Sequence, residues 1–231
     1  MISYTMLHTI DTGLTDYPQM LARQRELFSE MVERKKHGLP IDNEYIFFTE
    51  HRPVVTLGRH AESANVLIPE EVLKENGIDV FRIERGGDVT YHGPGQLVVY
   101  PLIDLEKYHL GVKDYVDMLE ECVIRTIAHF GVKGERVKGA SGVWIGAGSN
   151  AERKICALGV KCSRYITMHG LALNVNTDLD GFRIINPCGF TDKGVTSLAK
   201  ECGRQIDMSI VTNILKDFFI TLLKEHQQPT K

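Results

Sequence analysis

The spacing of apolar and polar positions along the chain predicts three amphipathic helices. From Asp16 to Lys36, apolar residues recur every three or four positions, with arginine, glutamate and lysine on the opposite side. The same spacing runs from Asp114 to Phe130, where Gly131 is placed to end the helix, and from Ser209 to Glu225. All three patterns are typical of helices that pack one face against a core.

Between the helical segments lie short runs rich in β-branched and aromatic residues, which predict strands. These runs are EYIFFTEH, PVVTLGR, DVFRIER, QLVVYPLIDL, GVWIG, KICALGVKC and GLALNVN. Strands and helices do not alternate strictly, which disfavours a doubly wound parallel sheet. We therefore expect an α+β fold with a mixed, largely antiparallel sheet flanked by helices. Since no linker rich in proline, glycine or serine interrupts the chain, residues 1–231 are expected to form a single domain.

Composition narrows the function classes. The chain has 231 residues, of which 43% are hydrophobic and 25% charged, as is typical of a globular chain with a substantial core. Its net charge of −3 argues against nonspecific binding to nucleic acid or acidic membranes. No membrane span or secretory signal is predicted. The five cysteines are an odd number without a CxxC pair, so they indicate neither a disulfide scaffold nor a zinc site and favour a cytoplasmic location.

The stretch RGGDVTYHGPGQ, residues 85–96, is a candidate ligand-binding loop of low specificity. Gly86 and Gly87 can adopt positive φ and leave room for a ligand against the main chain. The pattern matches neither of the glycine motifs that bind phosphate. Taken alone, Arg85 is more typical of a surface ion pair, and His92 is equally typical of a ligand contact and of a turn.

Cys188 stands out as the candidate nucleophile. Cys122 lies on the apolar side of a predicted helix and Cys156 lies in an apolar strand, so both are expected to be inert. Cys162 and Cys202 have no context beyond basic neighbours. In NPCGF, proline directs the chain and glycine leaves space beside the Cys188 sulfur, although an unreactive turn cysteine is an equal alternative.

A nucleophilic cysteine must be ionised. With an ordinary thiol pKa of about 8.5, roughly 3% is thiolate at pH 7. A neighbouring cation that lowers this pKa by about two units raises the fraction to about three quarters. Spacing along the chain does not choose among the candidate cations, which are Lys154, Lys161, Arg164, His169 and His92.

Three separated segments also agree with one known family. They are RGGDVTYHGPGQLVVYPL, RKICALGVKCSRYITMHGLALNVNTDL and INPCG, with 188 − 154 = 34 residues between the lysine and the cysteine. In order and spacing, from about Tyr45 to Leu198, they resemble the lipoyl(octanoyl) transferases. This resemblance implies the catalytic-domain fold of the biotin/lipoate protein ligases, which agrees with the α+β outline.

The resemblance further implies roles for single residues. Cys188 matches the residue that forms an acyl thioester, and Lys154 matches the lysine held beside it. The segments that match the lining of the acyl group are Arg85, Gly86, Gly87, Asp88, Val89, Thr90, Tyr91 and His92; Ala157, Leu158 and Gly159; and Gly170, Leu171 and Ala172. Tyr91 and His92 would border the reacting end. His169 and His92 either share in proton transfer or form structural hydrogen bonds.

The implied reaction is ATP-independent transfer of an octanoyl or lipoyl group from acyl carrier protein to a lysine of a lipoyl domain. Such domains occur in 2-oxoacid dehydrogenase complexes and in the glycine cleavage H protein. No metal or cofactor is implied, and a monomer is the default. Because donor carriers are acidic, a basic patch of Arg153, Lys161 and Arg164 is expected near the channel mouth.

Four other functions stay open at this point. An ATP-dependent lipoate or biotin ligase shares the fold but needs no cysteine nucleophile. An enzyme that moves lipoyl groups between carrier proteins differs only in its donor. A catalytically inactive acyl-binding module would not depend on Cys188 for any activity. A Cys-His protease ranks far behind, because no third orienting residue is visible.

Overall fold

The structure is a computed structural model that describes residues 5–186 and 194–227. Its strands are β1 (Met6–Thr15), β2 (Asn43–His51), β3 (Val54–Leu57), β4 (Asp79–Arg82), β5 (Val89–His92), β6 (Gln96–Leu102), β7 (Glu135–Val137), β8 (Ala140–Ile145), β9 (Arg153–Ser163), β10 (Ile166–Asn174) and β11 (Gly194–Val195). Its α-helices are α1 (Tyr17–Lys36), α2 (Glu70–Glu75), α3 (Val112–Ala128), α4 (Leu198–Cys202) and α5 (Met208–Gln227).

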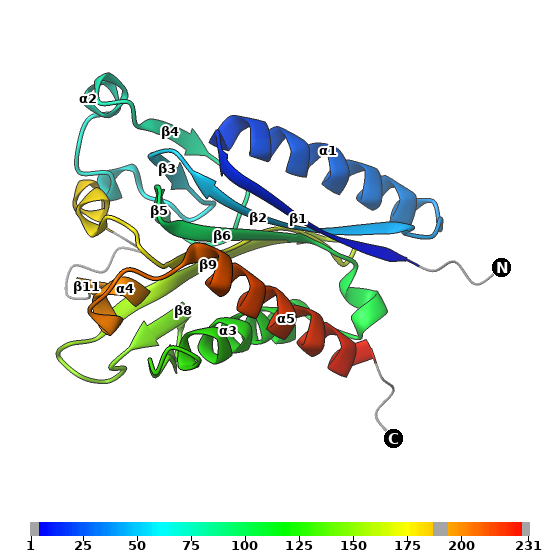
Figure 1. The fold of residues 1–231 in the computed structure, drawn as a ribbon. Coiled ribbons are helices and arrows are strands. Elements are labelled where there is room, and N and C mark those ends of the chain that lie inside the picture. Colours follow the sequence, from blue (N-terminus) through cyan, green and yellow to red (C-terminus); the bar gives the residue numbers. More distant parts are fainter. Residues whose placement is uncertain (1–4, 187–193, 228–231) are drawn as a thin grey trace.

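A large sheet runs through the centre of the molecule in the order β1-β2-β6-β10-β9-β8-β7, and β11 pairs with β9. The β1–β2 and β9–β11 pairs are parallel, and the other neighbours are antiparallel. A smaller sheet has the order β4-β3-β5. Helix α1 covers one face of the large sheet, and α3 and α5 cover the other (Figure 1). The expected α+β fold with a mixed, largely antiparallel sheet is therefore confirmed.

The three long helices form where the apolar spacing predicts them. Helix α1 has a proline in its first turn and three basic residues in its last, and both features favour a helix at those ends. Helix α3 begins two residues before the predicted start, where the Asp114 carboxylate accepts a hydrogen bond from the Gly111 N–H. Gly131 adopts a φ of 78° just beyond this helix, as expected for a residue that ends it.

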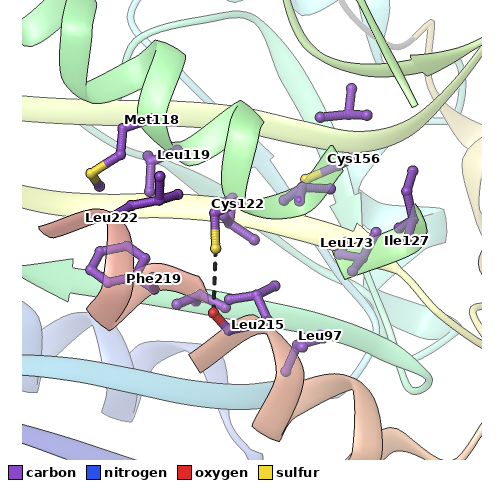
Figure 2. Packing of buried hydrophobic residues seen from close by; sticks show 14 of the residues in the cluster. Leu97, Met118, Leu119, Cys122, Ile127, Cys156, Leu173, Leu215, Phe219 and Leu222 are labelled. Carbon is purple, nitrogen blue, oxygen red and sulfur yellow. Dashed lines mark hydrogen bonds between the residues drawn. The ribbon is translucent and has the colours of Figure 1, made fainter. Parts of the chain in front are cut away.

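The cysteines of the core are unreactive by position. Cys122 and Cys156 lie in the apolar cluster between the large sheet and helices α3 and α5 (Figure 2). The Cys122 thiol donates to the carbonyl of Leu215 at 3.3 Å. Burial raises the pKa of both thiols well above the ordinary range. Burial and a raised pKa both agree with the expectation that these two thiols are inert.

The short elements α2, α4, β7 and β11 were not predicted, and two further segments also differ from the sequence prediction. Residues 85–96 are not a continuous loop, because Val89–His92 forms β5 and pairs with β3. Strand β1 was not predicted at all. It is an edge strand whose ladder has a register irregularity between Asp11 and Leu14, so its side chains show no clean alternation of buried and exposed positions.

Candidate active site

A largely apolar cavity lies between the large sheet and the segment that leads into β5. Strands β6, β9 and β10 form its floor, residues 83–92 form the opposite wall, and Tyr17 of α1 closes one side. The hollow encloses about 570 Å³ including the space at its open mouth. An apolar lining with a few polar groups is typical of sites that bind small apolar ligands.

The structure brings most of the sequence-predicted residues together at this cavity. Those that line it are Arg85, Gly87, Asp88, Val89, Thr90, His92, Lys154, Ala157, Leu158, Gly159, His169, Gly170, Leu171 and Ala172. Gly86 and Tyr91 lie just outside the lining. Tyr91 packs against Phe182, with ring centroids 5.4 Å apart, because alternate residues of a strand face opposite sides. Acyl binding by these segments remains a prediction.

Close backbone contacts explain two glycines of the floor. A Cβ atom at Gly159 would lie 2.8 Å from the carbonyl oxygen of Gly86, whose own N–H donates to the Val160 carbonyl at 2.9 Å. A Cβ atom at Gly170 would lie 2.1 Å from the carbonyl oxygen of Val99. Both positions exclude a side chain, so at these two points the floor consists of main chain alone.

Arg85 is buried, which corrects its interpretation as a surface ion-pair residue. Its Nη2 donates to the carbonyl and hydroxyl oxygens of Thr56 at 2.8 and 3.1 Å, and its Nη1 donates to the Gly86 carbonyl at 3.0 Å. The guanidinium group thus fastens the glycine segment to β3. It also places a fixed positive charge beside the cavity.

Lys154 lines the cavity from β9 and is only 7% exposed. Its Nζ lies 4.5 Å from the centroid of the Trp144 ring, and its backbone carbonyl accepts a hydrogen bond from the Thr196 N–H at 2.9 Å. Cys188 lies outside the described residues. The proximity of this cysteine to Lys154 therefore stays a prediction from the sequence.

A buried hydrogen-bond chain orients His92. Gln96 donates through Nε2 to Asn174 Oδ1 at 2.9 Å and to the Tyr91 carbonyl at 3.2 Å, so its Oε1 accepts from His92 Nδ1 at 2.7 Å. Asn174 in turn donates to the Thr196 carbonyl at 3.0 Å. With the proton on Nδ1, the Nε2 of His92 is left as a hydrogen-bond acceptor.

Neither His92 nor His169 can serve as the cation that ionises a thiol. Burial lowers the pKa of His92 to about 3, with further contributions from the neighbouring His51 and Arg85. Burial, together with Arg85, likewise lowers the pKa of His169 to about 3. Both rings are neutral at pH 7, which removes them from the list of candidate cations. Of the remaining candidates, Lys154 is the one that lines the cavity.

These two histidines predict a loss of stability in acid. Because the pKa of each ring is lower in the folded chain, the unfolded chain binds more protons between pH 6.5 and about 3, and stability falls as the pH drops through this range. When the pH falls from 7.5 to 5, each ring takes up a proton in the unfolded chain but not in the folded one. We expect this difference to lower the free energy of unfolding by about 2 kcal/mol for each histidine. Urea unfolding at both pH values should show a smaller loss for His92→Asn. The exposed His60→Gln control should retain the wild-type loss, and an equal loss in all three proteins would contradict this origin.

Of the three residues of the expected basic patch, Arg153 and Lys161 contact carboxylates, whereas Arg164 is exposed. Arg153 forms an ion pair with Glu201, in which Nη2 lies 2.5 Å from a carboxylate oxygen. The Lys161 ammonium lies 4.0 Å from a carboxylate oxygen of Glu84 and 4.6 Å from the ring centroid of Phe28. These contacts give no support to a docking surface built on Arg153 and Lys161.

An aromatic and histidine cluster that the sequence does not predict lies beside the cavity. His51 donates through Nδ1 to the Thr15 carbonyl at 2.8 Å and accepts through Nε2 from the Tyr100 hydroxyl at 2.9 Å. Tyr17 packs on His51, with ring centroids 5.2 Å apart. His51 ends an apolar strand, which is a signal for a buried polar role, whereas nothing in the sequence around Tyr17 distinguishes it from other core residues.

In residues 5–186 and 194–227, histidine, cysteine, aspartate and glutamate do not gather in groups of three that could ligate an ion. Nor does any helix in these ranges combine the length and the apolar character that a membrane span requires.

The sequence is similar to that of several bacterial octanoyltransferases. It is 51% identical over 219 residues to one from Porphyromonas gingivalis, which covers 94% of this chain but only 44% of that longer protein. It is 49% identical over 213 residues to one from Parabacteroides distasonis, covering 92% of this chain and 96% of the relative. An octanoyltransferase of Bacteroides fragilis is 53% identical over 203 residues, covering 88% and 91%.

Solved structures share the fold at low sequence identity. A bipartite lipoate protein ligase from Thermoplasma acidophilum superposes with a TM-score of 0.67 at 18% identity, covering 95% of this chain and 84% of its own. A lipoate-protein ligase A crystallised with ATP has a TM-score of 0.66 at 18% identity, covering 95% and 85%. The family model described as the lipoyl protein ligase A/B catalytic domain matches residues 16–220. The chain therefore belongs to the lipoyl protein ligase A/B catalytic domain family.

Proposed function

We propose that this chain is an octanoyltransferase, which moves an octanoyl or lipoyl group from acyl carrier protein to a lysine of a lipoyl domain without ATP. Its relatives of 49–53% identity carry the name octanoyltransferase. The observation that carries the proposal for this chain is the apolar cavity at which Lys154 and the three predicted lining segments meet.

In the first step, the thiolate of Cys188 attacks the carbonyl carbon of the octanoyl thioester. The new carbon–sulfur bond forms as the bond to the pantetheine sulfur breaks, so one thioester replaces another and the step is nearly balanced in energy. Lys154, as an ammonium, stabilises the thiolate before the attack and then gives a proton to the departing pantetheine sulfur.

In the second step, the amine of the acceptor lysine attacks the Cys188 thioester. The neutral Lys154 amine takes the proton that the attacking nitrogen loses, and the Cys188 thiolate leaves beside the restored ammonium. The product is an amide, which is more stable than a thioester. The reaction is therefore downhill without nucleotide activation.

The partners follow from the reaction. The donor is octanoyl-acyl carrier protein, and the acceptors are lipoyl domains of 2-oxoacid dehydrogenase complexes and the glycine cleavage H protein. The proposal includes no nucleic acid or membrane partner. The protein is proposed to act as a monomer in the cytoplasm, where a thiol nucleophile stays reduced.

Intact-mass measurement tests this function. Wild-type protein mixed with octanoyl-carrier, without ATP or acceptor, should gain the mass of one octanoyl group, which hydroxylamine removes. Addition of a lipoyl domain should then move this mass to the domain. A product that requires ATP and free octanoate would identify a ligase instead, and a marked preference for a lipoylated carrier would identify a lipoyl relay enzyme. No product under either condition would leave an acyl-binding module.

A further inference from the structure

Trp144 has no part in the proposed mechanism, yet it is the residue on which Lys154 rests. It is the only tryptophan of the chain and is 1% exposed in β8. The Lys154 ammonium lies 4.5 Å from the centroid of its ring. A cation within about 6 Å of an indole face is attracted by the ring quadrupole, most strongly where water is excluded. Lys154 meets that condition, because it is only 7% exposed.

A break in strand register creates this contact. Val143 pairs with Cys156, whereas Trp144 pairs with Lys154, so Ile155 is an extra residue on β9. Such a bulge changes the side of the sheet to which the next side chain points. Ile155 and Cys156 both face the apolar core, and Lys154 is turned to the cavity, directly across from Trp144.

The neighbouring residues hold both members of the pair. The Trp144 Nε1 donates to the Ala140 carbonyl at 3.2 Å. Gly142 adopts a φ of 121°, and a Cβ there would lie 2.5 Å from the Cys156 carbonyl oxygen and 3.3 Å from Lys154 Cε, so glycine lets both β9 and the lysine stem come close. The buried Glu120 carboxylate accepts from the Gly142 N–H at 2.8 Å and so anchors this part of β8 to α3.

The backbone of Lys154 is fixed from the other side. Its carbonyl accepts from the Thr196 N–H at 2.9 Å, and β11 pairs with β9 at this residue. Pairing with β11 thus fixes the backbone of Lys154. Its methylene stem lies against Gly142, and its Nζ lies over the indole ring of Trp144. A lysine has four rotatable stem bonds, so a contact at the ammonium end is what selects one position for the charge.

We infer that Trp144 is a positioning residue for Lys154, whose ammonium it holds at the cavity through the face of its ring. This inference rests on the proposed function. In this role Trp144 acts through the lysine, not on the substrate or the thiol. It acts by keeping the lysine charge and its transferable proton in one place during acylation.

Because the chain has a single tryptophan, ring electronics can be altered at this residue alone. Fluorine withdraws electron density from the indole face and changes its size little, so growth on mono-, di- and trifluorotryptophan grades the attraction. We expect the single-turnover rate of acylation by octanoyl-carrier to fall with each added fluorine, by roughly tenfold in total, while the thermal midpoint changes little. A rate independent of fluorination would overturn the inference.

Two substitutions give an independent test. Trp144→Phe retains an aromatic face and should keep the acylation rate within about threefold of wild type, whereas Trp144→Leu removes the face and should lose roughly tenfold. The control Phe219→Leu removes a buried aromatic ring of α5 that takes no part in the proposed mechanism. It should lower the thermal midpoint without changing the acylation rate. Equal rates for the two Trp144 variants would show a packing role only. Failure of the wild-type protein itself to acylate would refute the proposed function instead.

Discussion

Lys154→Ala is expected to slow acylation by octanoyl-carrier about 10³-fold. The substitution removes the amine group that the proposed mechanism uses to stabilise the thiolate and to protonate the departing pantetheine sulfur. Proton transfer by a positioned side chain typically contributes 10²–10⁴-fold, so about 10³-fold is the central expectation. Single-turnover acylation followed by intact mass measures the rate directly. Part of the lost acylation rate should return at high pH, where solvent hydroxide ionises the thiol without help from a lysine.

Lys154→Arg separates the two tasks of this residue. Arginine keeps the positive charge and can lie over the Trp144 ring, so thiolate formation should survive. A guanidinium group does not release its proton near neutral pH, so protonation of the leaving group should remain impaired. We expect a rate between those of wild type and Lys154→Ala. Wild-type rates in both variants would rule out this role for Lys154.

Cys188→Ala is expected to abolish the acylated form of the protein and to lower transfer to the lipoyl domain by about 10⁴-fold or more. The reason is chemical, since no other side chain in the proposed mechanism can hold the acyl group between donor and acceptor. Hydroxylamine-sensitive mass on the protein and amide formation on the lipoyl domain are the two readouts.

Cys162→Ala is the matched control. Cys162 is half-buried in β9, burial raises the pKa of its thiol, and it does not line the cavity. This variant should acylate at the wild-type rate. If instead Cys188→Ala transfers normally, the thioester mechanism is wrong and the chain is either a ligase or an acyl-binding module.

Local patterns of the sequence were enough to place the long helices and most strands. The apolar stripes of α1, α3 and α5 are readable because each helix buries one face against one sheet. Strand β1 was missed because an edge strand with one neighbour has no need for alternating burial. Strand β5 was missed because its four residues lie between glycines that signal a turn.

The sequence predicted which residues make up the candidate site, through its motifs, but not how those residues are arranged. The family resemblance pointed to the residues that meet at the cavity, but it carried no information on their burial. Arg85 reads as a surface cation until Thr56, which is 29 positions away, is seen to accept its hydrogen bonds. The pairing of Trp144 with Lys154 depends on the extra residue Ile155, and no local pattern announces such a bulge.

The two glycines of the cavity floor limit how this protein can diversify. At Gly170 even a methyl group would part β6 from β10, and at Gly159 it would push the glycine segment off the sheet. A lineage that adapts to shorter or longer fatty chains therefore cannot do so at these two positions. Its accessible mutations lie where side chains already line the cavity, such as Ile83 in the wall and Val98 in β6, and can be exchanged one methylene at a time.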